Sequence, residues 1–348
     1  MTTDNKGPRA RRSVFSATAL SAAVIAALLP AAAFASDYTS IGSYGSQAAS
    51  QPVLSLTGSD ITIGSGSLTS NAVQLGGTGN TISVSADTDL LIQNADIDGE
   101  SKWSEGNATV TDRYTDASEV GASALAQGES KTGVARNSVL TLDSKGTLTI
   151  KNGKSASGVL YRSAIRVKGS GNTVAVNRNE TATRVTLTGG IMNSGVDSSE
   201  NEGSTVDIRL TGTGSSITGG IVTGMNASTS ITLKPSDGGT AELNGNTLVG
   251  GGTYTLNAGS GSTVTGRTWV RESSYTPSTP IISKAVIHLS GNASQKASGE
   301  APEVGISEGL GSVFTETADA GTLVTGDFRS IRGASMKLTL NGTFTGNA

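Results

Sequence analysis

The amino-acid sequence predicts an all-β protein built as a parallel β-solenoid, in which short strands follow one another around stacked rungs of about 23 residues. Three observations predict this fold. One glycine-rich turn phrase recurs at long, regular intervals, short apolar runs alternate with Gly, Asn, Ser and Asp, and no helical periodicity is evident after residue 35. The 348 residues include no cysteine, so stacking rather than disulfide bonding is expected to hold the fold together.

The turn phrase has the pattern G-x-G-[N/S]-[S/T]-[I/V] and occurs at Gly77–Ile82, Gly169–Val174, Gly212–Ile217 and Gly259–Val264. Its second glycines are separated by 92, 43 and 47 residues, which we interpret as four, two and two rungs. Weaker glycine turns lie at Gly146, Gly190 and Gly239. Glycine is favoured at such corners because it adopts a positive φ without steric cost.

Short runs of apolar residues alternating with Thr or Ser predict the strands, because this period is typical of a half-buried strand. They lie at Val53–Leu56, Ile61–Ile63, Val73–Leu75, Thr81–Val84, Leu90–Ile92, Val139–Leu142, Leu148–Ile150, Ala164–Val167, Thr173–Val176, Val185–Leu187, Val206–Leu210, Ile231–Leu233, Ala241–Leu243, Tyr254–Leu256, Val286–Leu289 and Met336–Leu340. A β-sandwich or an up-and-down barrel would also use short strands. Two-residue Asn-Gly or Asp-Gly loops between matched strands are few, which favours the parallel coil.

The first 35 residues have the pattern of a signal peptide. A basic start is followed by an uncharged, Ala- and Leu-rich stretch that closes with Ala33-Phe34-Ala35, so cleavage is expected before Ser36. A retained membrane anchor is the alternative. The general secretory route is preferred, with twin-arginine export suggested by Arg11-Arg12 as the other route. Residues 36–348 are then the mature β-helical domain.

Charge bears on the kind of partner. The whole chain has a formal net charge of −3, and the signal segment removes four basic residues but only Asp4 among the acidic ones. The mature chain is therefore more acidic than the precursor. No basic stripe exists that would displace counterions from phosphates, so nucleic acid is not an expected partner.

Two stretches break the strand rhythm and are predicted to be excursions from the coil, at residues 100–136 and 267–283. The first contains Trp103 and Tyr114, and the second contains Trp269 and Tyr275. Long loops of a solenoid commonly carry its specific function, so these four aromatic residues are the predicted binding residues. The alternative is that the two stretches are ordinary insertions whose aromatics pack as lids.

Patterns that suggest chemistry are each better explained without it. Gly305–Gly309 matches the G-x-S-x-G nucleophile elbow but lacks the required flanking strand and helix. His288 is the only histidine, and no aspartate is paired with it by position. Gly76–Ile82 resembles a calcium-binding nonapeptide, but Thr81 stands where the carboxylate belongs, and Asp96–Glu100 lacks the spacing of a calcium loop. We therefore expect no catalytic residue, no metal and no cofactor.

With its signal peptide, lack of cysteine, and corner phrases GTGNTI and GSGNTV, the chain resembles the passenger domain of a bacterial autotransporter. The resemblance implies a right-handed, single-stranded parallel β-helix. It also implies a protein secreted through the periplasm of a Gram-negative bacterium and displayed on, or released from, its surface. The last residues, Thr343–Ala348, do not match the family's terminal membrane barrel, so a passenger lacking its barrel is expected.

The functions that this resemblance implies are adhesion or aggregation without catalysis. The implied partners are glycans or proteins of host or neighbouring cells, the export machinery, the outer-membrane translocator and further copies of the chain. The alternative function is a polysaccharide-active β-helical enzyme, which would need paired carboxylates in a groove.

Overall fold

The computed structural model describes residues 36–38, 41–44, 53–65, 73–75, 79, 81–94, 125–127, 136–151, 163–167, 169–195, 203–271, 282–296, 303–304, 312–330 and 334–347. The chain divides into two units, Met1–Ala33 and Phe34–Ala348, and all described residues belong to the second. The predicted signal peptide, residues 1–35, lies outside the described residues. Within the described ranges every regular element is a strand, as predicted.

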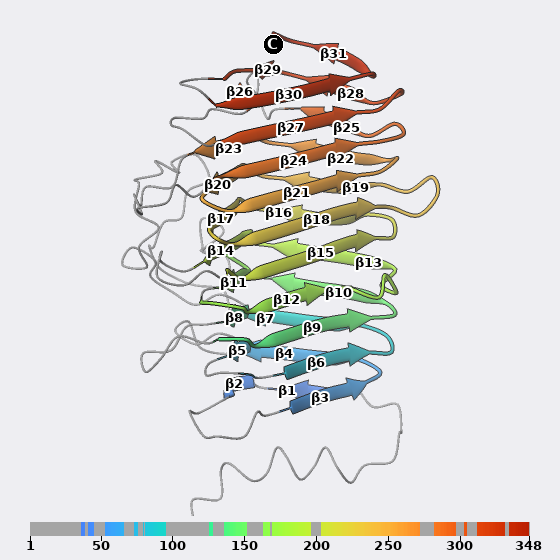
Figure 1. Ribbon diagram of the computed structural model, residues 1–348. Coiled ribbons are helices and arrows are strands. Elements are labelled where there is room, and N and C mark those ends of the chain that lie inside the picture. Colours follow the sequence, from blue (N-terminus) through green and yellow to red (C-terminus); the bar gives the residue numbers. More distant parts are fainter. Residues whose placement is uncertain are drawn as a thin grey trace, which may run out of the picture. The chain divides into compact units, whose positions relative to one another are not determined.

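Three parallel sheets form the coil (Figure 1). Sheet A contains β1 (Ser36–Tyr38), β4 (Ile61–Ser65), β7 (Leu90–Asn94), β10 (Thr147–Lys151), β13 (Arg184–Thr188), β16 (Ser215–Thr218), β19 (Ala241–Asn244), β22 (Ser262–Thr265), β25 (Ser294–Lys296), β28 (Leu323–Thr325) and β31 (Thr343–Thr345). Sheet B contains β2 (Ile41–Tyr44), β5 (Val73–Leu75), β8 (Leu125–Gln127), β11 (Ile165–Val167), β14 (Ile191–Gly195), β17 (Ile221–Met225), β20 (Thr247–Gly250) and β23 (Thr268–Arg271). Sheet C contains β3 (Val53–Gly58), β6 (Thr81–Ala86), β9 (Val139–Ser144), β12 (Thr173–Val176), β15 (Thr205–Thr211), β18 (Ser228–Lys234), β21 (Thr253–Ala258), β24 (Lys284–Leu289), β27 (Val313–Ala318) and β30 (Ser335–Leu340). A further pair, β26 (Glu303–Val304) and β29 (Asp327–Phe328), forms a small parallel sheet.

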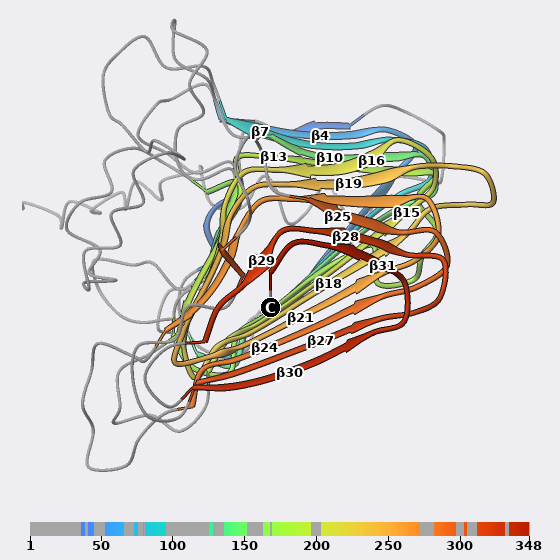
Figure 2. The same ribbon diagram turned by 90° about the horizontal axis from the view of Figure 1, so that it is seen from above.

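From β1 to β25 the chain visits the sheets in the repeating order A, B, C, so each rung adds one strand to each sheet, and in the two rungs that follow β26 and β29 take the place of a strand of sheet B. At the front of Figure 1 the strands of sheet C run from left to right while the coil rises toward the C-terminus. Seen from above in Figure 2, the chain passes from sheet C around to sheet A and then to sheet B, counter-clockwise as it rises. The coil is therefore a right-handed, single-stranded parallel β-helix, as predicted.

The length of a rung varies along the coil. Thr205 pairs with Ser228, an advance equal to the expected period, whereas Thr81 pairs with Val139. The difference arises in the connections, because the paired strands have similar lengths. The expected period of about 23 residues therefore describes only the shortest rungs.

The turn phrase marks two different corners, which corrects the predicted rung count between its copies. The second glycines, Gly79, Gly171, Gly214 and Gly261, all have a positive φ, of 73°, 65°, 73° and 80°. The first two precede strands of sheet C, but the other two precede strands of sheet A. The first interval therefore spans two rungs rather than four, and the second spans one rung and a third. Both corners require the same backbone conformation, so both use the same phrase.

Inward-facing side chains stack in columns that fill the coil. In sheet A one column runs through Ile63, Ile92, Ile150, Leu187, Ile217, Leu243, Val264, Gln295, Val324 and Phe344. In sheet C one column runs through Leu56, Val84, Leu142, Val176, Ile208, Ile231, Leu256, Ile287, Glu316 and Leu338. Stacking like on like buries aliphatic surface in every rung, and this burial is the main stabilising term.

The two predicted excursions have different boundaries in the structure. Residues 125–127 form β8 of sheet B, and Arg136 precedes β9, so the coil continues inside the first predicted excursion. Arg267 and β23 also belong to the coil, which leaves residues 272–281 outside the described residues in the second. A three-residue strand such as β8 is too short to give a periodic signal in the sequence.

The connections differ between corners. Every connection from sheet C to sheet A is described, and these range from the dipeptides Ser59-Asp60 and Lys145-Gly146 to the segment 177–183. The stretches outside the described residues, such as 66–72, 95–124 and 152–162, connect instead to strands of sheet B or to the β26–β29 pair. One corner of the coil is therefore closed by short turns, and the long connections all begin or end beside sheet B.

Candidate functional site

The four predicted binding aromatics are not brought together as one described site. Trp103, Tyr114 and Tyr275 lie outside the described residues. Trp269 is described, but it lies in β23, in register with Leu248 of β20, and not in an excursion as predicted. Its side chain is half-buried on the outward side of sheet B.

Trp269 ends an outward column of sheet B that is largely apolar. The column contains, in register, Arg166, Met192, Val222, Leu248 and Trp269. Val222 and Leu248 do not belong to the inner core cluster, yet their side chains are only 8% and 6% exposed. Arg166 is also buried. Sheet B is therefore covered on both faces along these strands.

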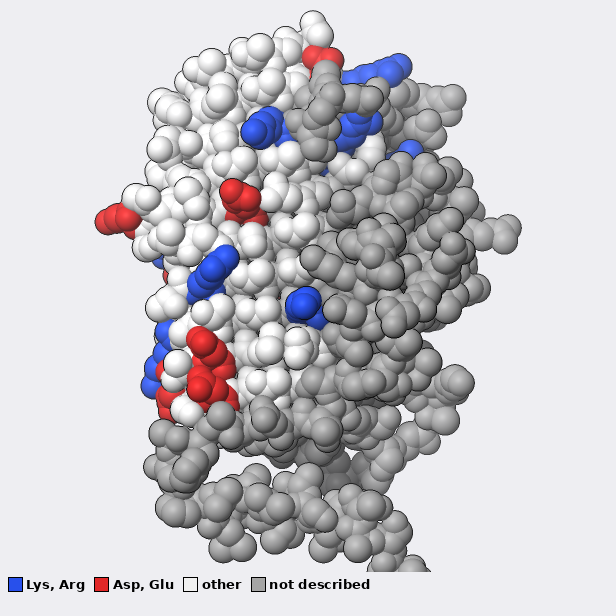
Figure 3. Space-filling model, turned by 180° about the vertical axis from the view of Figure 1, so that it is seen from behind, with Lys and Arg blue, Asp and Glu red and all other residues white. Residues whose placement is uncertain are grey.

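Sheets A and C present a different outer surface. Among the outward positions of β18 and β21, Ser228, Ser230, Thr232, Thr253 and Thr255 are half-buried, and Lys234 and Asn257 are exposed. On sheet A, Thr186, Ser216 and Thr263 occupy one outward column, interrupted by the exposed Glu242. Figure 3 shows the molecule from behind, on the side opposite sheet C, where charged side chains are few apart from a group of acidic side chains at the lower left. Short hydroxyl side chains suit solvent-facing strand positions, so these faces need no covering.

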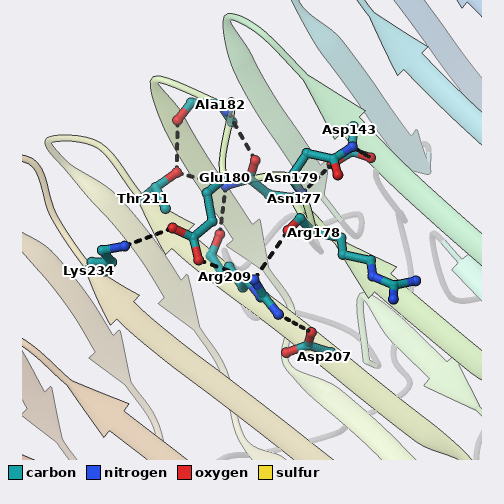
Figure 4. Close-up of polar contacts among 10 residues, drawn as sticks. All are labelled: Asp143, Asn177, Arg178, Asn179, Glu180, Ala182, Asp207, Arg209, Thr211 and Lys234. Atoms are coloured by element: carbon teal, nitrogen blue, oxygen red, sulfur yellow. Dashed lines mark hydrogen bonds and ion pairs between the residues drawn. The ribbon is translucent and has the colours of Figure 1, made fainter.

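The best-defined polar cluster lies in segment 177–183, the longest turn between sheets C and A (Figure 4). Asn177 takes a left-handed conformation with φ 54° and is fully buried. Its Nδ2 donates to the Arg209 carbonyl at 2.9 Å and to Thr211 Oγ1 at 2.7 Å, and its Oδ1 accepts from the Ala182 amide at 3.0 Å. Asn177 thus fixes the turn to the next rung without leaving a buried polar atom unpaired.

Charged side chains of three strands of sheet C, β9, β15 and β18, extend this cluster. Arg209 of β15 donates to Glu180 Oε1 at 3.1 Å and to Asp207 Oδ2 at 3.4 Å. Lys234 of β18 lies 2.9 Å from Glu180 Oε2. On the other side, Asn179 Nδ2 donates to Asp143 Oδ2 of β9 at 2.9 Å.

The electrostatics of this cluster suit a structural role. The hydrogen bond and charge of Lys234, with those of Arg209, lower the pKa of Glu180 below its ordinary value. A general acid needs a raised pKa, so the ion pairs oppose that role for Glu180. The arrangement ties the left-handed Glu180, at φ 55°, to the two following rungs.

The structure pairs the only histidine with an acid that the sequence analysis did not identify. His288 Nε2 lies 3.0 Å from Asp319 Oδ2, and both side chains are 45% exposed. His288 lies in β24, and Asp319 follows β27 in the next rung, so only the register of the strands reveals the pair. The predicted nucleophile-like segment Gly305–Gly309 lies outside the described residues, as does Asp96–Glu100.

Among the described residues, no group of three or more His, Cys, Asp or Glu side chains is arranged to hold a metal ion. The same part of the chain contains no helix long and apolar enough to span a membrane. Comparisons with protein-family models, with curated proteins and with solved structures found no match. The functional argument therefore rests on this chain alone.

Proposed function

We propose that this chain is a non-enzymatic exported protein, secreted or displayed at the surface of a Gram-negative bacterium, that acts as an adhesin. Its ligands would be glycans or proteins on host or neighbouring cells, with self-association as a further mode of contact. The coil serves as a regular support, and the connections beside sheet B carry the specific contacts. Export would use the secretory machinery and an outer-membrane translocator, in line with the resemblance to autotransporter passengers.

One observation carries this proposal. Connections from sheet C to sheet A have at most seven residues, whereas the longest connections, such as 95–124 and 152–164, begin or end at sheet B, where other connections are dipeptides. Variable loops on one side of a regular support are where solenoid proteins usually carry binding residues. Trp103 and Tyr114 lie in such a connection, so they remain the first binding candidates.

The experiment replaces residues 101–122 by a Gly/Ser segment of equal length in the full chain. This design spares β8, which the predicted excursion had wrongly included. We expect an unchanged far-ultraviolet β signal and a loss of binding to cells. A Gly/Ser replacement of the corner residues 235–240, between sheets C and A, should leave binding unchanged.

Two outcomes would contradict the proposal. Unchanged cell binding after replacement of 101–122 would remove the assigned role of that connection. Turnover of a polysaccharide panel, abolished by a single carboxylate substitution, would favour the polysaccharide-active enzyme. Glu316, whose pKa is raised as a general acid would need, is fully buried and cannot reach a polymer.

A further inference from the structure

Two inward columns of the core are interrupted by a polar side chain at a single place each. In sheet C the column position between Ile287 and Leu338 is Glu316, and the remaining members are aliphatic. In sheet A the position between Val264 and Val324 is Gln295, and the remaining members are apolar. Gln295 on β25 and Glu316 on β27 belong to one rung and lie on different sheets, and their side chains interact inside the coil.

Both side chains are removed from solvent and incompletely bonded. Glu316 is 0% exposed and Gln295 is 2% exposed. Neither carboxyl oxygen of Glu316 has a hydrogen-bond partner of good geometry, and neither does Gln295 Oε1. Three buried acceptor atoms without a donor are a costly arrangement, and a proton on the carboxyl would supply a donor to Gln295 Oε1.

No described cation faces this carboxyl group. The elements packed against β27 carry Lys284 and His288 on β24, Lys337 on β30 and Lys296 on β25, and strand alternation places these on the outer surface. His288 is engaged outside by Asp319, and Asp327 of β29 accepts from Asn347. An ionised carboxylate would therefore be buried without compensation, which is strongly unfavourable.

We propose that Glu316 is held in the folded protein as a neutral carboxylic acid that donates its proton to Gln295 Oε1, and that this pair is a pH-responsive lock on the C-terminal rungs β27 to β31. The lock closes when the carboxyl is protonated, because the O–H satisfies the Gln295 acceptor. The lock opens when water reaches the carboxyl group and the group ionises, because the charged carboxylate is stable only in contact with water. This inference is independent of the proposed function.

The location makes the opening local. Met336, Leu338, Leu340 and Phe344, on β30 and β31, are only partly buried against the core. The strand beside β27 on this side therefore buries less apolar surface than the strands of the inner rungs. Elements with few buried apolar contacts open at lower free energy than the rest of a protein.

The direction of the pH dependence follows from the shift. Burial raises the pKa of Glu316 from 4.5 to about 8, while the nearby Gln295 amide offsets part of this effect. Below the ordinary carboxyl pKa, Glu316 is protonated in both the closed and the open state, so the closed state has its full stability. Between the ordinary and the raised pKa, Glu316 ionises only in the open state. The population of the open state therefore rises up to about tenfold for each pH unit.

The test is native-state hydrogen exchange of the full chain from pH 5 to 8, corrected for intrinsic exchange rates. In the wild type, opening of the β27 and β30 amides should increase up to about tenfold per pH unit. Glu316→Gln keeps the shape and can still donate to Gln295, so its opening should be independent of pH and lower at pH 8. Glu242→Gln, at an exposed glutamate of sheet A, should retain the wild-type profile.

A pH profile in Glu316→Gln that matches the wild type would overturn the proposal. If that variant does not fold, the carboxyl carbon of Glu316 can be titrated by NMR in the wild type. Titration of this carboxyl near pH 8 supports the lock. Titration in the ordinary carboxyl range overturns it.

Discussion

The corner between sheets C and A and the side occupied by sheet B differ in how the chain connects one strand to the next. At the corner the chain turns in a few residues, and glycines with positive φ allow the backbones of neighbouring rungs to touch. Beside sheet B the connections range from dipeptides, such as Gly189-Gly190, to the segment 95–124, and the outward column from Met192 to Trp269 is apolar. The difference teaches that the large variations in connection length lie on one side of the coil, while the corner from sheet C to sheet A keeps its turns short.

The largest expected effect tests the glycine corner itself. Gly212 has φ 79°, and a Cβ there would lie 1.7 Å from the Thr183 carbonyl oxygen of the preceding rung. Gly212→Ala should therefore lower the free energy of unfolding by about 3 kcal/mol or more, measured by urea denaturation. Gly238→Ala is the matched control, with φ 73° and nothing within 4 Å of the added Cβ. It should lose only about 1 kcal/mol, and equal losses would show that rung contact does not matter.

The next effect compares the outward columns. Leu248 of sheet B is 6% exposed, so Leu248→Ala should lower the free energy of unfolding by about 2 kcal/mol. Thr255→Ala, at an outward position of sheet C, should change it by less than ~0.5 kcal/mol. Similar values for the two variants in the same urea titration would mean that the apolar column contributes no burial energy.

A smaller loss is expected from the polar cluster at the corner. Asn177→Gly keeps the left-handed backbone but removes three buried side-chain hydrogen bonds, so we expect a loss of about 1.5 kcal/mol. Asn137→Gly is the control, because Asn137 has a similar φ of 51° and an exposed side chain. Comparing the melting temperatures of the two variants distinguishes the contribution of the hydrogen bonds from the effect of placing Gly at a left-handed position. A control as unstable as Asn177→Gly would contradict this account.

The smallest effect concerns the ion pairs. Arg209 and Glu180 are 34% and 31% exposed, so solvent screens their interaction, and Arg209→Gln should cost only about 0.5 kcal/mol at low salt. Because the pKa of Glu180 is lowered, this contribution is present above the ordinary carboxyl pKa and disappears as the pH falls below it. The difference between wild type and variant should therefore vanish at low pH and shrink in high salt. A difference that persists under both conditions would require another cause.

Much of the coil could be predicted from the sequence because strands and corners leave local signals. Alternating runs such as Thr173–Val176 became strands, and the second glycine of each turn phrase has the expected positive φ. The corner that each phrase occupies could not be predicted, since the same φ is needed before sheets A and C. Strand β27 was missed because Glu316 interrupts its apolar alternation.

The candidate sites were much less predictable, because they depend on register between residues far apart in sequence. The column that joins Leu248 to Trp269, and the contact of His288 with Asp319, each cross a full rung of variable length. The pairing of Glu316 with Gln295 requires the inward faces of two different sheets to be known together. The sequence does show that Phe314, Glu316 and Ala318 alternate on one face, and that signal would have placed the acid inside.

The turn from Pro235 to Thr240, between β18 and β19, extends beyond its neighbours at the right of Figure 2. Gly238 at its tip has free space on every side that a side chain would occupy. A foreign peptide grafted at this tip would be held clear of the surface by a scaffold whose rungs above and below need no adjustment. The molecule therefore offers an insertion point for epitope or enzyme display that is separate from the side to which we assign natural recognition.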